Sequence, residues 1–365
     1  MPRTNREIYD AEYFAPDEQF SGRYEQYRSP HEELFSSRNN DGDYFAPSRK
    51  GRQRRRPAKK GGGFGRFLLL LLLLGGLLLA AKHYGGFSLS RLGLELFGGE
   101  SECDTENIVT DYLVDLDALE RELPLVSNGY SPSEDDLYLL QQAKEQNPEL
   151  SEKLELFTRH IGSFSQAAVR TIYLSPEKLD YVLQDPLHAG EDSTGGTSLN
   201  VKKGRIPLLM QYDSRWGNHL YGSGGMGNTG CGPTCLSMVA AGLTGNGDYS
   251  PDVVADFAEQ NGYYIYGSGT SWSLFTEGAD SFGLEGYELP LNESSMKTVL
   301  RQGGAVILSV SPGDFTFAGH FIVVSGYENG KYKICDPSSL RRSRELWSSD
   351  ALLSQTVAAW GFRAR

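Results

Sequence analysis

The sequence predicts an α+β fold for the C-terminal part of the chain, preceded by a disordered tail, one transmembrane helix and a helical region. Three observations support this division. An uninterrupted apolar run occupies residues 67–81, and the charge changes sign across it. Residues 1–66 carry 14 Lys and Arg against 10 Asp and Glu, whereas the remainder has a net charge of −16. Apolar residues recur at helical spacing before residue 185 and form strand-like runs after residue 300.

Residues 1–63 are expected to form a disordered, basic tail. They are rich in Arg, Asp, Glu, Ser and Tyr, and their apolar residues follow no period, so they cannot bury enough surface to offset chain entropy. The basic residues at 49–60 could bind nucleic acid. Because they directly precede the apolar run, attraction to anionic lipid explains them better, and no nucleic-acid partner is expected.

The apolar run is predicted to be the core of a single membrane span. A helix of about 22 Å is short for about 30 Å of hydrocarbon, but Phe64 and Tyr84 can sit at the interfaces while Arg66 and Lys82 snorkel outward. Residues 64–84 then cross the cell membrane, with a cytoplasmic N-terminus and an extracellular C-terminal domain, because the basic block lies on the N-terminal side. A cleaved signal peptide is the competing interpretation, but the run begins far from the N-terminus.

Residues 85–185 are expected to form a helical extracellular region. Apolar spacing predicts helices over residues 108–119 and 150–161, and an acidic first turn after Ser131 or Ser133 predicts another over 134–143. No chemistry is expected in this region. Residues 186–203 contain several Gly and Ser residues and are interpreted as a linker.

Residues 204–365 are expected to form the α+β domain, which is large enough for its own core. Apolar and β-branched runs at 305–310, 321–324 and 331–334 predict strands, and Asn329-Gly330 predicts a hairpin turn over 321–334. A helix is expected after Cys231, because Leu236, Met238, Val239 and Leu243 lie on one stripe.

Cys231 is the candidate nucleophile. It lies in Gly230-Cys231-Gly232-Pro233-Thr234, and Pro233 is tolerated only in the first turn of a helix. The free N–H groups and the dipole of a helix start favour a thiolate, which is the reactive form. A small buried structural cysteine is the alternative interpretation.

Other residues supply partners for this thiol. His320 opens one strand of the predicted hairpin and Asp336 ends the other, so the imidazole and the carboxylate are expected to be neighbours. Asp336 would orient the ring while His320 takes the proton of Cys231. Gln211 is a candidate side-chain donor to an oxyanion hole, beside the backbone N–H of Cys231, although a surface glutamine is the alternative.

The remaining motifs are expected to be structural or to line a cleft. Four cysteines are too few for a disulfide framework, and both Cys235 and Cys335 are interpreted as structural. The glycine-rich loop 222–227 is expected to be a mobile rim, and residues 267–272 could line a substrate groove. No His, Cys and Asp cluster has zinc spacing, so neither a metal nor a cofactor is expected.

Five segments together resemble bacterial papain-like cysteine peptidases related to the bacteriocin-processing, double-glycine-leader peptidases, which form peptidase family thirty-nine of the cysteine class. The resemblance covers residues 204–365 and implies a papain-like fold, with Cys231 as nucleophile, His320 as base, Asp336 as orienting residue and Gln211 in the oxyanion hole. No multi-span region or P-loop is present, so leader removal during export is not expected. The segments are residues 206–217, 230–234, 312–316, 319–321 and 336–338.

These features predict a membrane-anchored, extracellular cysteine peptidase that hydrolyses a peptide or protein substrate. Two alternatives stay open. The same residues could serve a cell-wall amidase or endopeptidase in contact with peptidoglycan, or the domain could be a catalytically silent surface protein that only binds.

Overall fold

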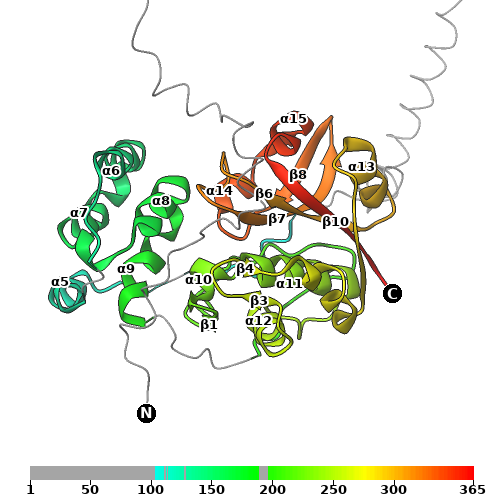
Figure 1. The fold of residues 1–365 in the computed structure, drawn as a ribbon, viewed down its shortest axis with the longest axis horizontal. Helices are drawn as coiled ribbons and strands as arrows, with labels where there is room; N and C mark the ends of the chain where they lie inside the picture. The colour runs from blue at the N-terminus through cyan, green and yellow to red at the C-terminus, as the bar shows by residue number, and fades with distance from the viewer. Residues whose placement is uncertain (1–102, 111, 113, 127–128, 189–195) are drawn as a thin grey trace, which may run out of the picture. The chain divides into compact units, whose positions relative to one another are not determined.

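The computed structural model describes residues 103–365, apart from 111, 113, 127–128 and 189–195 (Figure 1). The predicted tail and the predicted span at 64–84 lie outside the described residues. Within the described part of the chain, no helix is long and apolar enough to cross a membrane.

Between residues 116 and 188 the described part of the chain forms five α-helices, as expected for most of this region. Ser133 caps the second helix in a reciprocal capping box with Asp136, which matches the predicted acidic first turn. Short 3-10 turns connect the helices at residues 123–125, 148–150, 161–163 and 176–178. The helices are α5 (Leu116–Glu122), α6 (Glu134–Gln146), α7 (Ser151–Arg159), α8 (Gln166–Leu174) and α9 (Leu179–His188).

The helix predicted over 108–119 is wrong in its first half, because α5 begins only at Leu116. The backbone before it pairs with the C-terminal domain. The Asp104 N–H donates to the Ile206 carbonyl at 2.9 Å, and the Leu208 N–H donates back to the Asp104 carbonyl at 2.8 Å. The apolar residues at 108 and 112 pack against the main core, so their spacing reflects tertiary burial and not a helix.

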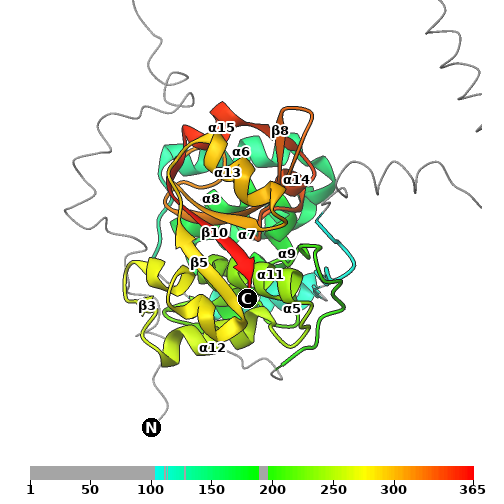
Figure 2. The same ribbon diagram turned by 90° about the vertical axis from the view of Figure 1, so that its right-hand side faces the viewer.

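A six-stranded antiparallel sheet organises the C-terminal domain, in the order β5-β10-β6-β7-β8-β9 (Figure 2). Its strands are β5 (Leu284–Glu288), β6 (Ala305–Val310), β7 (His320–Glu328), β8 (Lys331–Cys335), β9 (Leu346–Ser348) and β10 (Thr356–Ala364). Two small hairpins lie outside it, β1 (Leu220–Tyr221) with β2 (Gly224–Gly225) and β3 (Tyr264–Ile265) with β4 (Gly269–Thr270). The helices are α10 (Met226–Thr229), α11 (Cys231–Thr244), α12 (Pro251–Gln260), α13 (Glu293–Arg301), α14 (Leu340–Ser343) and α15 (Ser349–Leu353), with 3-10 turns at 272–275 and 278–282.

Both faces of this sheet are covered. Alternate side chains of β6 point to opposite faces, as the period of a strand requires. Ile307 packs in the core that contains α11, whereas Val306 and Leu308 pack in a second core with Met296 of α13 and Leu352 of α15. In both views α11 lies on one side of the sheet, and α13 and α15 lie on the other (Figures 1 and 2).

The predicted hairpin is confirmed. Asn329 and Gly330 both have positive φ, at 50° and 84°, as a two-residue hairpin turn requires. The register pairs Val323 with Cys335. His320 therefore begins β7 at the sheet end where β8 runs out into Asp336.

Candidate active site

Cys231 is the first residue of α11, as Pro233 predicts. Every residue of this helix from Gly232 to Leu243 is buried, so the helix start is held by its own core. A Cβ on Gly232 would lie 2.4 Å from the Thr270 hydroxyl, so only glycine allows β4 to approach the helix start. Cys235 is free and fully buried one turn later, which confirms its structural placement.

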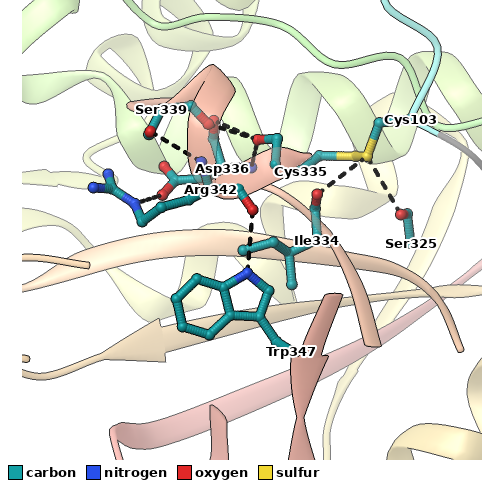
Figure 3. Close-up of a disulfide and its surroundings, with 9 residues drawn as sticks. Cys103, Ser325, Ile334, Cys335, Asp336, Ser339, Arg342 and Trp347 are labelled. Atoms are coloured by element: carbon teal, nitrogen blue, oxygen red, sulfur yellow. Dashed lines mark hydrogen bonds and ion pairs between the residues drawn. A yellow bond between two sulfur atoms is a disulfide. The ribbon is translucent and has the colours of Figure 1, made fainter. Parts of the chain in front are cut away.

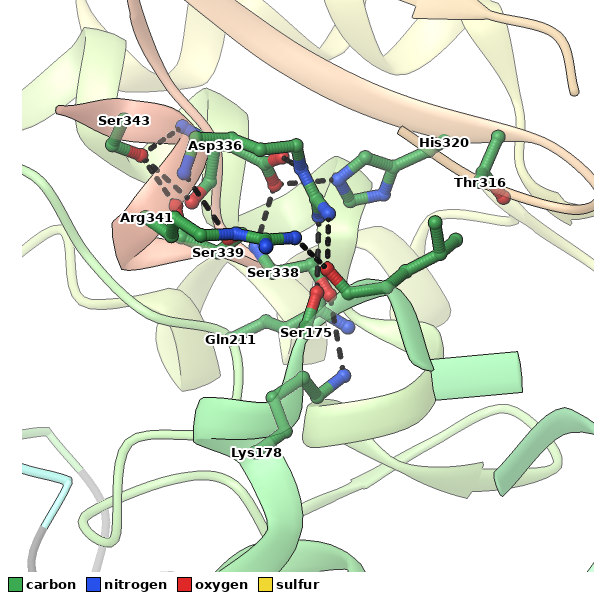
Figure 4. Close-up of polar contacts among 12 residues, drawn as sticks. Ser175, Lys178, Gln211, Thr316, His320, Asp336, Ser338, Ser339, Arg341 and Ser343 are labelled. Atoms are coloured by element: carbon green, nitrogen blue, oxygen red, sulfur yellow. Dashed lines mark hydrogen bonds and ion pairs between the residues drawn. The ribbon is translucent and has the colours of Figure 1, made fainter. Parts of the chain in front are cut away.

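The imidazole and the carboxylate predicted to be neighbours are in contact. His320 Nε2 lies 2.8 Å from Asp336 Oδ1, and both residues are buried (Figure 4). The ring also makes a side-chain hydrogen bond with Cys231. The ring therefore bridges the thiol and the carboxylate, and the Asp336 contact fixes its orientation.

Asp336 is fully buried and its carboxylate accepts hydrogen bonds at both oxygens. Oδ1 accepts from His320 and from the Ser338 backbone N–H at 2.8 Å. Oδ2 accepts from Arg342 Nε at 2.6 Å in an ion pair that is itself buried. Arg342 was not identified from the sequence. Its position six residues after Asp336, in the short helix α14, carries no distinctive pattern.

The charges of this cluster favour an ionised thiol. Burial acts to raise the pKa of Cys231, but the hydrogen bond and the charge of His320 outweigh it, and the net pKa is lowered. Burial acts to lower the pKa of His320, yet Asp336 and Cys231 raise it to about 9. Burial likewise opposes ionisation of Asp336, while Arg342 and His320 hold its pKa well below the usual range. These opposite shifts of the two pKa values favour a thiolate–imidazolium pair over a neutral pair.

Gln211 is buried beside this cluster and is not a surface glutamine. Its backbone N–H donates to the Pro337 carbonyl at 2.9 Å, which ties it to the turn after Asp336. Its side-chain Nε2 donates to the Gly227 carbonyl at 2.7 Å. Gln211 and Cys231 both line the same cleft.

The end of α8 and the following turn, residues 174–178, contact the turn that carries Asp336; we call these residues the clamp segment. Pro176 disfavours a helical Ser175, so α8 ends at Leu174 and leaves its last carbonyls unpaired. Arg342 Nη1 caps the Leu174 carbonyl at 2.8 Å, and Arg342 Nη2 donates to Ser175 Oγ at 3.1 Å. The sequence shows no chemistry in the helical region, and the structure adds that this region contacts the turn that carries Asp336.

The clamp segment makes a second set of contacts through its charged side chains. Glu177 Oε1 accepts a hydrogen bond from Ser339 Oγ at 2.6 Å. Lys178 is buried, and its Nζ donates to the Gly227 carbonyl at 2.8 Å and to Ser338 Oγ at 3.3 Å (Figure 4).

A cleft of about 670 Å³ contains the thiol and the imidazole. Its walls come from both regions of the chain, with Arg170, Lys178 and Asp185 on the helical side. On the other side, the loop 222–227 contributes Ser223 and Gly224, as its predicted place at the rim implies, and Gly267 and Gly269 also line the cleft. Trp272 instead packs edge-on against Trp360.

A disulfide joins Cys103 to Cys335, the residue directly before Asp336 (Figure 3). As expected, four cysteines do not build a disulfide framework of several bonds. One disulfide nevertheless forms, while Cys231 and Cys235 are free. Cys103 lies far away in sequence, and antiparallel pairing of β7 with β8 determines where Cys335 lies. Among the described residues, no group of three His, Cys, Asp or Glu side chains could hold a metal ion.

Residues 204–362 match the Peptidase_C39 like family. Two solved structures are similar to the chain. The peptidase domain of Streptococcus ComA, a bi-functional ABC transporter involved in a quorum-sensing pathway, is 21% identical, with 38% of this chain and 93% of that chain covered and a TM-score of 0.30. A C39-like peptidase from Bacillus anthracis is 16% identical, with 44% and 96% covered and a TM-score of 0.29. No curated protein matches the sequence.

Proposed function

We propose that the chain, whose residues 204–362 match the Peptidase_C39 like family, hydrolyses peptide bonds through Cys231, His320 and Asp336 on the outer face of the cell membrane. The observation that carries this proposal is one continuous contact chain. The thiol at the start of α11 is hydrogen-bonded to His320, whose other ring nitrogen lies 2.8 Å from the buried Asp336.

In the first half-reaction, the Cys231 thiolate attacks the carbonyl carbon of the scissile bond. The carbonyl oxygen becomes negative and is stabilised by the backbone N–H of Cys231 and by a side-chain N–H of Gln211. The tetrahedral intermediate collapses when the His320 imidazolium gives its proton to the leaving amine, and an acyl-enzyme thioester is left.

In the second half-reaction, neutral His320 takes a proton from water, which attacks the thioester carbonyl. Collapse of this second intermediate expels the Cys231 thiolate and releases the acid product. The imidazolium formed on His320 restores the starting pair. Asp336 stays ionised throughout, because its role is to orient the ring and to stabilise the imidazolium.

A labelling experiment tests the nucleophile. The purified chain is treated with iodoacetamide at limiting concentration, and the modified residue is mapped by mass spectrometry, together with hydrolysis of a fluorogenic peptide library. We expect Cys231 to be alkylated first, and the Cys231→Ala variant to lose both labelling and hydrolysis. Preferential labelling of Cys235, or hydrolysis that survives in the Ala variant, would contradict the assignment.

The extracellular location is supported by two independent features. The charge pattern around residues 64–84 favours an extracellular C-terminal domain. The bond between Cys103 and Cys335 is of a kind that persists in oxidising compartments and is rare in the cytosol. Protease added to intact cells should remove the domain after residue 84 and spare the tail before residue 64. Protection of the domain would reverse the orientation.

We propose a protein or peptide near the membrane surface as the substrate, in preference to peptidoglycan. The chain after residue 66 has a net charge of −16, so anionic wall polymers would repel it at long range. It also shows no internal repeat of the kind that binds a wall polymer. Incubation with isolated cell walls should release no soluble amines. Release that depends on Cys231 would favour the amidase alternative.

A further inference from the structure

Lys178 is a buried cation that the reaction described above does not use. Lysine is seldom fully buried unless it is paired with a carboxylate, yet this side chain is only 2% exposed. Its two hydrogen-bond acceptors are a backbone carbonyl, at Gly227, and a hydroxyl, at Ser338. A cation held by neutral acceptors in the wall of the catalytic cleft needs a reason beyond folding stability.

The first acceptor is shared with the oxyanion-hole candidate. The Gly227 carbonyl accepts from Lys178 Nζ at 2.8 Å and from Gln211 Nε2 at 2.7 Å. Two donors on one carbonyl fix its direction, and that direction decides where the Gln211 amide points. The same Nε2 also donates to the Met226 carbonyl at 3.4 Å, so two adjacent backbone carbonyls set the orientation of this amide.

The second acceptor leads to the other side of the catalytic centre. Ser338 receives the Lys178 hydrogen bond on its hydroxyl, while its backbone N–H donates to Asp336 Oδ1 at 2.8 Å. That carboxylate oxygen also contacts His320. One ammonium group therefore connects the Gln211 side of the site to the Asp336 side.

We propose that Lys178 is a positioning residue of the peptidase reaction, through which the helical region sets the Gln211 amide and the Asp336 turn in register with Cys231. This inference rests on the proposed function. It implies that residues 204–362 alone lack a part of their catalytic centre.

The charges around Lys178 give its role a distinct pH signature. Cys231 and Asp336 face it from the C-terminal domain and Asp185 from α9, and these anions favour the protonated form, whereas Arg342 opposes it. Burial outweighs the anions and lowers the pKa of Lys178 to about 8. Activity should therefore begin to fall near pH 8, below the pH at which His320 loses its proton.

The test compares Lys178→Met and Lys178→Arg with the wild type, and Lys153→Met serves as the control. Lys153 also lies in the helical region, but it pairs with Asp180 at the surface and away from the cleft. Three quantities are measured in the full chain. They are kcat and KM on the library peptide cleaved fastest, inhibition by the aldehyde N-acetyl-alanyl-alaninal, and the rate at which iodoacetamide alkylates Cys231.

Loss of the lysine should damage the oxyanion side and spare the thiolate. In Lys178→Met we expect kcat to fall about tenfold with KM within about twofold, and aldehyde binding to weaken about tenfold, because a misplaced donor acts on the tetrahedral adduct. Alkylation of Cys231 should change less than about threefold. Lys178→Arg keeps the donors and should recover most of kcat, and its activity should persist to about pH 9, because arginine stays charged.

Several outcomes would overturn the proposal. A kcat for Lys178→Met equal to that of Lys153→Met would show that Lys178 does not affect the reaction. Equal losses of hydrolysis, aldehyde binding and alkylation in Lys178→Met would show that its role is purely structural. If the Met variant does not fold, an unchanged alkaline limit in Lys178→Arg overturns it. If the wild type cleaves no library peptide, the proposed function fails, while the aldehyde and alkylation measurements still decide the role of Lys178.

Discussion

The two ends of the catalytic centre are built in different ways. Cys231 is placed by the helix that it begins, and that helix is buried along almost its whole length by neighbouring residues. Asp336 stands in a turn that is held by one nearby residue and by two distant parts of the chain. Arg342, six residues later, pairs with the carboxylate of Asp336 and caps the Leu174 carbonyl of the clamp segment, and Cys103 is bonded to the residue before Asp336.

The position of Cys231 thus depends mainly on the helix that it begins, whereas the position of Asp336 also depends on residues far away in the sequence. The position of a nucleophile at a helix start depends mainly on that helix, so we expect changes elsewhere in the chain to affect it little. The position of a carboxylate that distant groups hold changes when one of those groups is removed. The helical region therefore affects the position of Asp336 more than that of Cys231. The following variants test this contrast in order of expected effect.

Removal of the nucleophile should have the largest effect. Cys231→Ala is expected to lower hydrolysis by at least about 10⁴-fold, because no other group can form the thioester. Cys235→Ala, four residues later in the same helix, should keep most of the activity. Equal losses in the two variants, with the fold intact by circular dichroism, would contradict the local placement of the reactive thiol.

Removal of Arg342 should have the next largest effect. Arg342→Met leaves the buried carboxylate of Asp336 without its counter-ion, so we expect a stability loss of about 3–5 kcal/mol and activity about 100-fold lower. Urea unfolding and peptide hydrolysis measure the two. Arg344→Met changes an exposed arginine of the same turn and should leave both nearly unchanged. Similar stabilities and activities for the two variants would show that Asp336 keeps its position without the Arg342 ion pair.

Loss of the disulfide should affect stability more than rate. The bond closes a loop with a sequence separation of 232, so the Cys103→Ser, Cys335→Ser double variant should lose about 2–4 kcal/mol. Arg342 and Ser338 still hold Asp336, so activity should stay within about threefold. Dithiothreitol should reproduce the stability loss in the wild type and have no effect on the double variant. A collapse of activity would mean that the bond itself positions the carboxylate.

A pH effect on stability should be the smallest. The folded-state pKa of His320 is raised to about 9, so the folded protein binds a proton that the unfolded chain releases above its own pKa of about 6.5. The His320 contribution to stability is thus fully present below pH 6.5 and is lost as the pH rises towards 9. Thermal denaturation between pH 6 and 8 should show a steeper decline for the wild type than for His320→Gln. Parallel dependences of stability on pH in the wild type and in His320→Gln would show that the contact of His320 with Asp336 does not stabilise the fold.

The sequence predicted the local half of this comparison well. Pro233 located the start of α11, and Asn329-Gly330 set the hairpin register that brings His320 to Asp336, because both signals depend only on neighbouring residues. The helix start near residue 134 was predicted for the same reason, with Ser131 and Ser133 as the two candidate caps, and Ser133 is the cap. The roles of Cys231, His320, Asp336 and Gln211 stay predictions, although Gln211, Cys231 and His320 line one cleft and Asp336 contacts His320.

The tertiary half could not be predicted in the same way. Leu174 and Lys178 lie in an ordinary helical stretch, and nothing in their neighbourhood shows that they meet a turn more than 150 residues later. The apolar residues at 108 and 112 misled the helix prediction, because burial against another domain can imitate an amphipathic period. Cys103 and Cys335 gave no spacing signal. Antiparallel pairing of β7 with β8 sets the position of Cys335, and backbone hydrogen bonds of Asp104 with Ile206 and Leu208 hold Cys103 against the C-terminal domain.

The disulfide also determines how the molecule carries load. Tension applied to the chain on the N-terminal side of Cys103 passes through the two sulfurs into Cys335, at the end of a central strand of the sheet. Residues 104–334 form a closed loop and stand outside the line of force. If the chain is tethered through its N-terminal part, the helical region and the thiol at the start of α11 are therefore mechanically shielded, and force on the tether acts at Cys335, directly before Asp336.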